Sequence, residues 1–264
     1  MMTLDELVGA ARGLALGARW EQATGLLDAA AARLPQTAEG RGAGARIALA
    51  AAEIAVDSVW YNGNDEGAAR LSKVDADALD DLGRWDLEFA RFRSTYYAHL
   101  RQHAPFLREE GQRFVDSAPD ARRLGWAHMY LGLVYDNVLE ERVDAPAHYE
   151  IALANSGDDP LLRREAQRHL GDHDHDAGDH ADALARWRDA TSAGAAMGMV
   201  AGTLSQQILL AVLARDAGDE AGAVALATEV LRWSEAIGAG RIAGQCRNFL
   251  AGVDPTQPPP APSE

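Results

Sequence analysis

The tetrad Asp176-Ala177-Gly178-Asp179 recurs as Asp216-Ala217-Gly218-Asp219, 40 residues further along the chain. The same step relates flanking residues, namely Leu170 to Leu210 and Ala183 to Ala223. Each tetrad stands between two segments whose apolar residues follow the spacing of one helix face. Glycine allows the chain to turn tightly, and the aspartate after it can cap the helix that follows. The tetrad therefore predicts a repeated helix–turn–helix unit.

The composition of the whole chain agrees with helical structure. Hydrophobic residues make up 47% of the 264 residues, which is enough to build a large core. Alanine, leucine, arginine, aspartate and glutamate dominate, whereas β-branched residues are sparse. Because that mixture favours helix over strand, the composition predicts an all-α protein.

Three segments share a pattern of small residues in both helices of a unit, with a bulky residue in one of them. The matching positions are Leu170-Gly171, Gly178, Ala183, Trp187 and Ala190; Leu131-Gly132, Tyr135, Ala145, Tyr149, Ala152 and Pro160; and Trp20, Ala23, Leu27, Ala30 and Pro35. In this pattern the chain resembles the tetratricopeptide repeat family. Its spacing exceeds the about 34 residues of the common repeat, so it is similar to the longer helical repeats of bacterial signalling and regulatory proteins.

The resemblance implies a right-handed α-solenoid of about six antiparallel helix pairs, formed by residues 1–252. The expected pairs and the C-terminal capping helix are 3–33, 39–74, 83–117, 119–155, 158–195, 197–237 and 240–251. The second and third pairs fit the pattern loosely, and the second combines a long first helix with a short second one. Residues 253–264 contain five prolines and are expected to form an extended, disordered tail.

Charge and cysteine content exclude several classes of protein. The net charge of -15 disfavours binding to nucleic acid, because an acidic surface repels phosphates. Cys246 is the only cysteine, which excludes a disulfide framework, and its apolar neighbours predict a buried, inert thiol. The N-terminus carries acids where a signal peptide needs basic residues, and no apolar run of about 18 residues exists. We therefore expect a cytoplasmic protein that does not bind a membrane.

The densest polar cluster is Asp172-His173-Asp174-His175-Asp176, followed by Asp179 and His180. Three interpretations remain open: a solvated helix end, a binding surface or a metal site. The metal candidates are His169, His173 and Asp176, since the two histidines are one helical turn apart. A calcium-binding EF-hand loop is excluded, because Ala177 and Ala183 stand where glycine and a bidentate acid are needed.

Sequence signatures of catalysis are missing. The glycine-rich run 40–45 follows no predicted strand, as a dinucleotide site would require. The chain has no phosphate-binding loop, no Gly-x-Ser-x-Gly elbow and no His-Glu-x-x-His zinc motif. We therefore expect a protein that is not an enzyme and that needs no cofactor.

In the family that the chain resembles, the first helix of each pair lines a concave groove. That resemblance implies a partner-binding groove between the fourth and sixth pairs, made by Trp126, Met129, Leu133, Asp136, Asn137, Glu165, Arg168, Asp172, His175, Asp176, Ser205, Ile208, Val212, Arg215 and Asp216. Asn137, Asp176 and Asp216 hold equivalent positions, so a partner with basic or amine groups is expected. The carboxylate clamp of some relatives needs lysine, arginine and asparagine, and only Arg168, Arg215 and Asn137 are available for it here.

The predicted function is a non-catalytic scaffold that binds a protein or peptide in this groove. Two alternatives stay open. The first is a ligand- or peptide-sensing module of a bacterial regulatory system. The second is a metal-binding protein that uses the His/Asp cluster at 169–180. No nucleic acid, membrane or cofactor is expected, and the oligomeric state is not predicted.

Overall fold

The computed structural model describes residues 2–63, 66–100 and 102–253, and within these ranges the chain forms α-helices and no β-strand. The thirteen α-helices of this part are α1 (Leu4–Leu16), α2 (Trp20–Ala31), α3 (Ala38–Asn62), α4 (Gly67–Leu71), α5 (Asp81–Ala98), α6 (Phe106–Ser117), α7 (Ala121–Val134), α8 (Ala145–Ala154), α9 (Pro160–Asp176), α10 (His180–Ala196), α11 (Val200–Asp216), α12 (Glu220–Ala236) and α13 (Gly240–Leu250). The all-α prediction is confirmed. Apart from Val253, the proline-rich tail lies outside the described residues.

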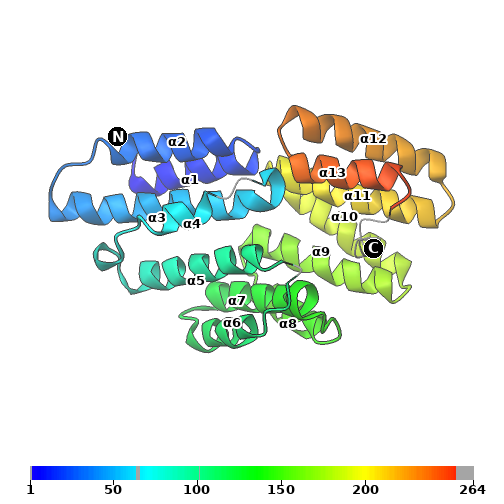
Figure 1. Cartoon of the computed structure of the whole chain (residues 1–264), viewed down its shortest axis with the longest axis horizontal. Coiled ribbons are helices and arrows are strands. Elements are labelled where there is room, and N and C mark those ends of the chain that lie inside the picture. Colours follow the sequence, from blue (N-terminus) through cyan, green and yellow to red (C-terminus); the bar gives the residue numbers. More distant parts are fainter. Residues whose placement is uncertain (1, 64–65, 101, 254–264) are drawn as a thin grey trace.

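Helices that are neighbours in the sequence are mostly neighbours in space. Within each expected pair range the first helix packs against the second, and α1 with α3, α3 with α5, α7 with α9 and α11 with α13 are also in contact. Figure 1 shows the resulting order, from α1 and α2 through α5 to α8 and back to α11, α12 and α13. The unequal second pair also appears, with 25 residues in α3 and five in α4.

The Asp-Ala-Gly-Asp echo is part of a finer period of 20 residues. Helices α9 to α12 contain 17 residues each. Two residues after the end of each helix stands a glycine in the left-handed region. The φ values are 85, 70, 84 and 74° at Gly178, Gly198, Gly218 and Gly238. The residue after each glycine donates its N–H to a carbonyl five residues back, as Asp179 does to Asp174 at 2.9 Å. This turn satisfies carbonyls that the helix end leaves free.

Small residues allow the two helices of a unit to approach closely. A Cβ atom added at Gly171 would lie 2.5 Å from Cδ1 of Trp187, and one added at Gly132 would lie 2.6 Å from Cε1 of Tyr149. Both large side chains are fully buried. The two glycines occupy equivalent positions of successive units, so the pattern that prompted the family resemblance has a packing cause.

The two ends of the helical array meet. Helix α13 contacts α3, and α1 contacts α11. Trp20 stacks on Tyr61 at a centroid distance of 6.2 Å, and both rings pack against the core formed by α11, α12 and α13. In Figure 1 the C-terminal end of α3 reaches the C-terminal helices. The array therefore closes around its concave side.

Helix α7 continues into a short π-helix, η2 (Tyr135–Leu139), after which Glu140 adopts a left-handed conformation with φ of 59°. A π-turn adds one residue to a helical turn and is frequent at functional sites. Here it contains Asp136 and Asn137, which both line the cavity described below.

Candidate functional site

A cavity of about 970 Å³ lies inside the closed array. Most of its lining comes from the first helices of the pairs, that is from α1, α3, α5, α7, α9 and α11. On α3, the lining residues Glu53, Asp57, Trp60 and Tyr61 follow the spacing of a single helix face. The volume falls in the upper part of the range for ligand-binding cavities.

Aromatic side chains form much of the cavity wall. They are Trp20, Trp60, Tyr61, Trp85, Phe89, Tyr96, Tyr97, Trp126 and Tyr130. The Tyr97 and Tyr130 hydroxyl oxygens are 3.1 Å apart, and the Asn137 amide donates to the Tyr96 hydroxyl at 3.0 Å. These hydrogen bonds hold the phenol rings in place and satisfy their polar ends, so the aromatic wall is apolar and ordered.

A buried arginine lies in the middle of this wall. The Arg93 side chain is 10% exposed, and its guanidinium carbon lies 5.6 Å from the centre of the Phe89 ring. It donates to Asp57 at 2.5 Å, and a second nitrogen lies 3.7 Å from Glu53. Half of the Asp57 side-chain surface is accessible, but protein atoms surround the carboxylate and limit its contact with bulk water. This desolvation raises the pKa of Asp57, although the positive charge of Arg93 opposes the shift.

A second polar centre forms where η2 faces α9. The Tyr149 hydroxyl donates to Asp136 at 2.6 Å, and Nε2 of His173 lies 3.1 Å from the same carboxylate. Directly before His173, burial raises the pKa of Asp172 to about 6, although Arg168 opposes the shift. One turn before His173, burial and the neighbouring Arg168 lower the pKa of His169 well below its usual value. Burial therefore favours the uncharged form of both side chains.

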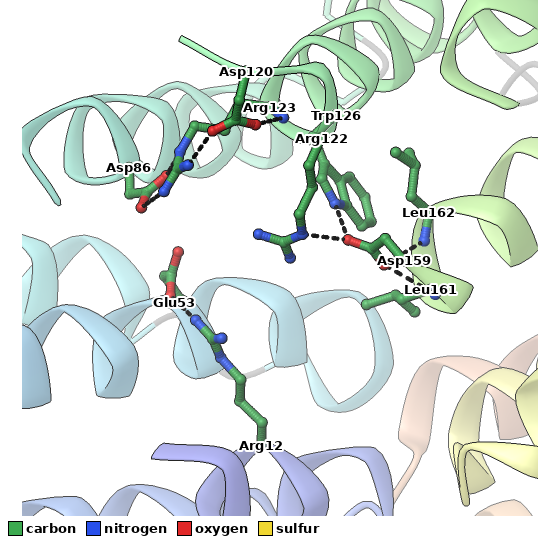
Figure 2. A network of polar contacts seen from close by, with 10 residues as sticks. All are labelled: Arg12, Glu53, Asp86, Asp120, Arg122, Arg123, Trp126, Asp159, Leu161 and Leu162. Atoms are coloured by element: carbon green, nitrogen blue, oxygen red, sulfur yellow. Dashed lines mark hydrogen bonds and ion pairs between the residues drawn. The ribbon is translucent and has the colours of Figure 1, made fainter. Parts of the chain in front are cut away.

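Figure 2 shows a polar network from this region, in which the Arg12–Glu53 pair of α1 and α3 faces side chains of α5 and α7. Arg123 holds Asp86 through two hydrogen bonds of 2.7 Å and also pairs with Asp120. Arg12, Glu53, Asp86 and Arg123 all line the cavity. Each of the two facing walls thus carries both a positive and a negative group.

Asp159 organises the same network from the start of α9. Its carboxylate accepts from the backbone N–H groups of Leu161 and Leu162 at 3.1 Å each, from Trp126 at 3.0 Å and from Arg122 at 2.7 Å (Figure 2). Burial disfavours the charge, but the hydrogen bonds from Trp126, Leu162 and Arg122 outweigh it and lower the pKa of Asp159. One carboxylate therefore caps α9 and fixes two cavity-lining residues of α7.

Ten of the fifteen predicted groove residues line the cavity. They are Trp126, Met129, Leu133, Asp136, Asn137, Glu165, Arg168, Asp172, Asp176 and Ser205. The other five, His175, Ile208, Val212, Arg215 and Asp216, do not line it. Ile208 and Val212 are core residues instead, because that part of α11 packs against Ile242 and Phe249 of α13. On α11, the cavity-lining residues end at Leu209.

The N-terminal half of the cavity was not predicted from the sequence. Glu53, Asp57 and Arg93 lie in α3 and α5, in the two loosely matched pairs, and Arg12 lies in α1, outside the predicted groove between the fourth and sixth pairs. The signal was the density of aromatic residues at helical spacing in α5, together with the acids of α3. Such stripes usually form the core of a helical protein. They indicate a site here only because the two ends of the array meet and bring these helices to the cavity.

The histidines and acids of the 169–180 cluster divide between several environments. His169 stacks on Tyr149 at 5.2 Å, and His173 contacts Asp136. The predicted metal set of His169, His173 and Asp176 does not converge in the described ranges, whereas His175, His180 and Asp216 do. Cys246 is buried as predicted, and burial raises its pKa to about 11.

No protein-family model matches the chain, and comparisons with curated proteins and with solved structures found no significant similarity. In the described part of the chain, no helix has the length and apolar character needed to span a membrane.

Proposed function

We propose that this chain is a right-handed solenoid of six helix pairs with α13 as its cap, of the tetratricopeptide type. We further propose that it is a non-catalytic binding protein whose central cavity takes a short peptide segment. Its support is the cavity of about 970 Å³ formed by the first helices of successive pairs. The 20-residue period and the Gly171–Trp187 and Gly132–Tyr149 contacts support the repeat assignment.

The chemistry of the cavity wall favours a peptide. Eight carboxylates and seven guanidinium groups line it alongside nine aromatic rings. Most of the charged groups pair with one another, as Arg123 does with Asp86 and Arg12 with Glu53. A polyanion such as nucleic acid would meet the carboxylates, whereas a peptide carries both charges, amides and apolar side chains that such a wall can match.

The contacts between the two ends of the array favour a small ligand over a folded domain. Because α1 contacts α11 and α13 contacts α3, helices from both ends of the array surround the cavity, which stays partly open to solvent. The same arrangement supports a second candidate function, a sensing module of a bacterial regulatory system that binds a peptide or a small molecule. In that case the ligand would stabilise the closed array.

A peptide-capture experiment tests the first proposal. Tag-free protein is incubated with a pool of random tetra- to octapeptides, and the retained peptides are identified by mass spectrometry. We expect the wild type to retain a defined subset and the variant Glu53→Gln/Asp57→Asn to lose it. The matched control is Glu229→Gln/Glu235→Gln, two exposed acids of α12 far from the cavity lining. Equal retention by both double variants would contradict binding in the cavity.

The same wild-type protein distinguishes a peptide ligand from a small-molecule ligand. Thermal denaturation is measured with the peptide pool and, separately, with a pool of small metabolites. A rise in melting temperature with peptides alone agrees with the first proposal, and a rise with metabolites alone contradicts it and supports a sensing module for a small molecule.

A further inference from the structure

Three potential metal ligands meet at the turn that follows α9, and none of them lines the cavity. His175 lies in the last turn of α9, His180 is the first residue of α10 and Asp216 is the last residue of α11. One ligand atom from each lies within 4.8 Å of the others. Nε2 of His175 is 2.9 Å from Oδ2 of Asp216. In residues 2–63, 66–100 and 102–253, no other set of three or more His, Cys, Asp or Glu side chains converges in this way.

The His175 ring is held in place before any ion binds. Its side chain is 9% exposed and stacks on the buried Trp187 at a centroid distance of 5.6 Å. Its Nδ1 atom is buried without a hydrogen-bond partner and faces a carboxylate oxygen of Asp176 at 3.6 Å. Arg142 fixes that carboxylate at 2.6 Å. Metal-bound histidines commonly have a carboxylate beside the ring nitrogen that does not bind the ion.

Three helix ends meet at this cluster. The C-terminal ends of α9 and α11 place partial negative charge there, which favours a bound cation. The N-terminal end of α10 at His180 carries partial positive charge and opposes it, so the affinity for a cation comes from the ligand atoms and not from the helix ends. Two imidazoles and one carboxylate select a transition metal such as Zn²⁺ or Ni²⁺ over Mg²⁺ or Ca²⁺, which prefer oxygen ligands.

The internal repeat provides a comparison within the same chain. Positions 215 and 220 are the equivalents of 175 and 180, one 40-residue unit later. There the turn brings together Arg215 and Glu220, which form two hydrogen bonds of 2.8 Å. At 175 and 180 the same turn brings together two histidines, with ring centroids 5.2 Å apart. Two imidazoles cannot form an ion pair with each other, but a cation can bind both.

We propose that His175, His180 and Asp216 bind one divalent transition-metal ion, with solvent completing its coordination. The ion would join α9, α10 and α11, and so would link two successive 40-residue units. The ion would lie outside the cavity lining, on α9 and α11, two helices that contribute other residues to that lining. This proposal does not depend on the ligand of the cavity.

The test uses the full chain without a tag, treated with a chelator and then titrated with ZnCl₂ or NiCl₂. Calorimetry is expected to give one site per chain, and the melting temperature should rise with Zn²⁺ and not with Mg²⁺. Asp216→Asn and His180→Ala should each weaken Zn²⁺ binding by about tenfold or more. His103→Ala, an exposed histidine outside the cluster, serves as the control and should bind as the wild type does.

A second variant separates loss of the site from loss of the fold. The double change His175→Arg/His180→Glu copies the ion pair of the next unit into this turn. It should abolish the Zn²⁺ site while leaving the metal-free melting temperature within a few degrees of the wild type. X-ray absorption of the Zn²⁺-loaded wild type should show only nitrogen and oxygen ligands. A wild type with no Zn²⁺ site, or unchanged Zn²⁺ affinity in the double variant, would overturn the proposal.

Discussion

The backbone of Gly171 lies directly against the indole ring of Trp187. A Cβ atom at position 171 would stand 2.5 Å from Cδ1 and 2.6 Å from Nε1 of that ring. The ring is fully buried, and its Nε1–H donates to the Arg168 carbonyl at 3.0 Å, so it has little freedom to move away. This contact sets the distance between α9 and α10.

Gly171→Ala is therefore expected to destabilise the protein. Overpacking of a fixed core costs ~1–3 kcal/mol, which outweighs the gain of about 1 kcal/mol in helix propensity. Urea denaturation monitored by circular dichroism measures the change. Gly25→Ala is the control, because Gly25 is an exposed residue of α2 with no atom within 4 Å of its added Cβ. That change should raise stability by roughly 0.5–1 kcal/mol, and a shift of the same sign in both variants would argue against the packing explanation.

Ala18→Gly is expected to stabilise the protein. Ala18 adopts φ of 61° in the turn between α1 and α2, where the later turns have glycine. The left-handed conformation costs a residue with a Cβ ~1–2 kcal/mol, and glycine removes that cost. The greater freedom of glycine in the unfolded chain reduces this stabilisation by roughly 0.5–1 kcal/mol. We expect a net increase of about 0.5–1 kcal/mol in the free energy of unfolding. Gly178→Ala, the reverse change at φ of 85°, should lower it.

Asp159→Asn should destabilise the protein in a pH-dependent way. The pKa of Asp159 is lower in the folded chain than in the unfolded one, so the folded state binds its proton less tightly. The charged carboxylate thus stabilises the fold above the unfolded pKa of about 4, and this contribution is lost as the pH falls through the lower folded value. We expect a loss of about 1–2 kcal/mol at pH 7 that shrinks below pH 4. A loss that stays constant down to pH 2 would contradict the role assigned to the charge.

Asp172→Asn should show the opposite pH dependence. Burial raises the pKa of Asp172 to about 6 in the folded chain, above the unfolded value of about 4. The charged form therefore costs stability above pH 6, and this cost disappears as the pH falls toward 4. The variant should be more stable than the wild type by ~1–3 kcal/mol at pH 8, with no advantage at pH 4. Asp189→Asn, an exposed acid of α10, should change stability little at either pH.

The fold was largely predictable because its signals are local. Turn glycines such as Gly178 and Gly218 mark helix ends by backbone conformation alone, and Gly171 with Trp187 marks close helix contacts. The 20-residue period is not visible in the tetrad, because its other turns, at Gly198 and Gly238, lack the flanking aspartates. The tetrad therefore marks only every second turn.

The site was predictable only in part because it depends on contacts between distant segments. A helical stripe identifies one face of α7 or α9, and those residues do line the cavity. No local pattern shows that α1 and α3 meet the C-terminal helices, so Arg12 and Asp57 were missed. The metal candidates were sought at one-turn spacing within a helix. The set that converges instead comes from three helices, with His175 on α9, His180 on α10 and Asp216 on α11 of the next unit.

The meeting of the two chain ends also bears on how the protein folds. A linear helical repeat needs contacts only between adjacent units, so it can fold outward from any unit. Here the rings of Trp20 and Tyr61 are covered by a core that includes residues beyond position 200. Such distant contacts carry a large loop-closure cost and slow the final step of folding. During synthesis from the N-terminus, these two aromatic rings therefore stay without their final cover until the helices beyond position 200 have left the ribosome.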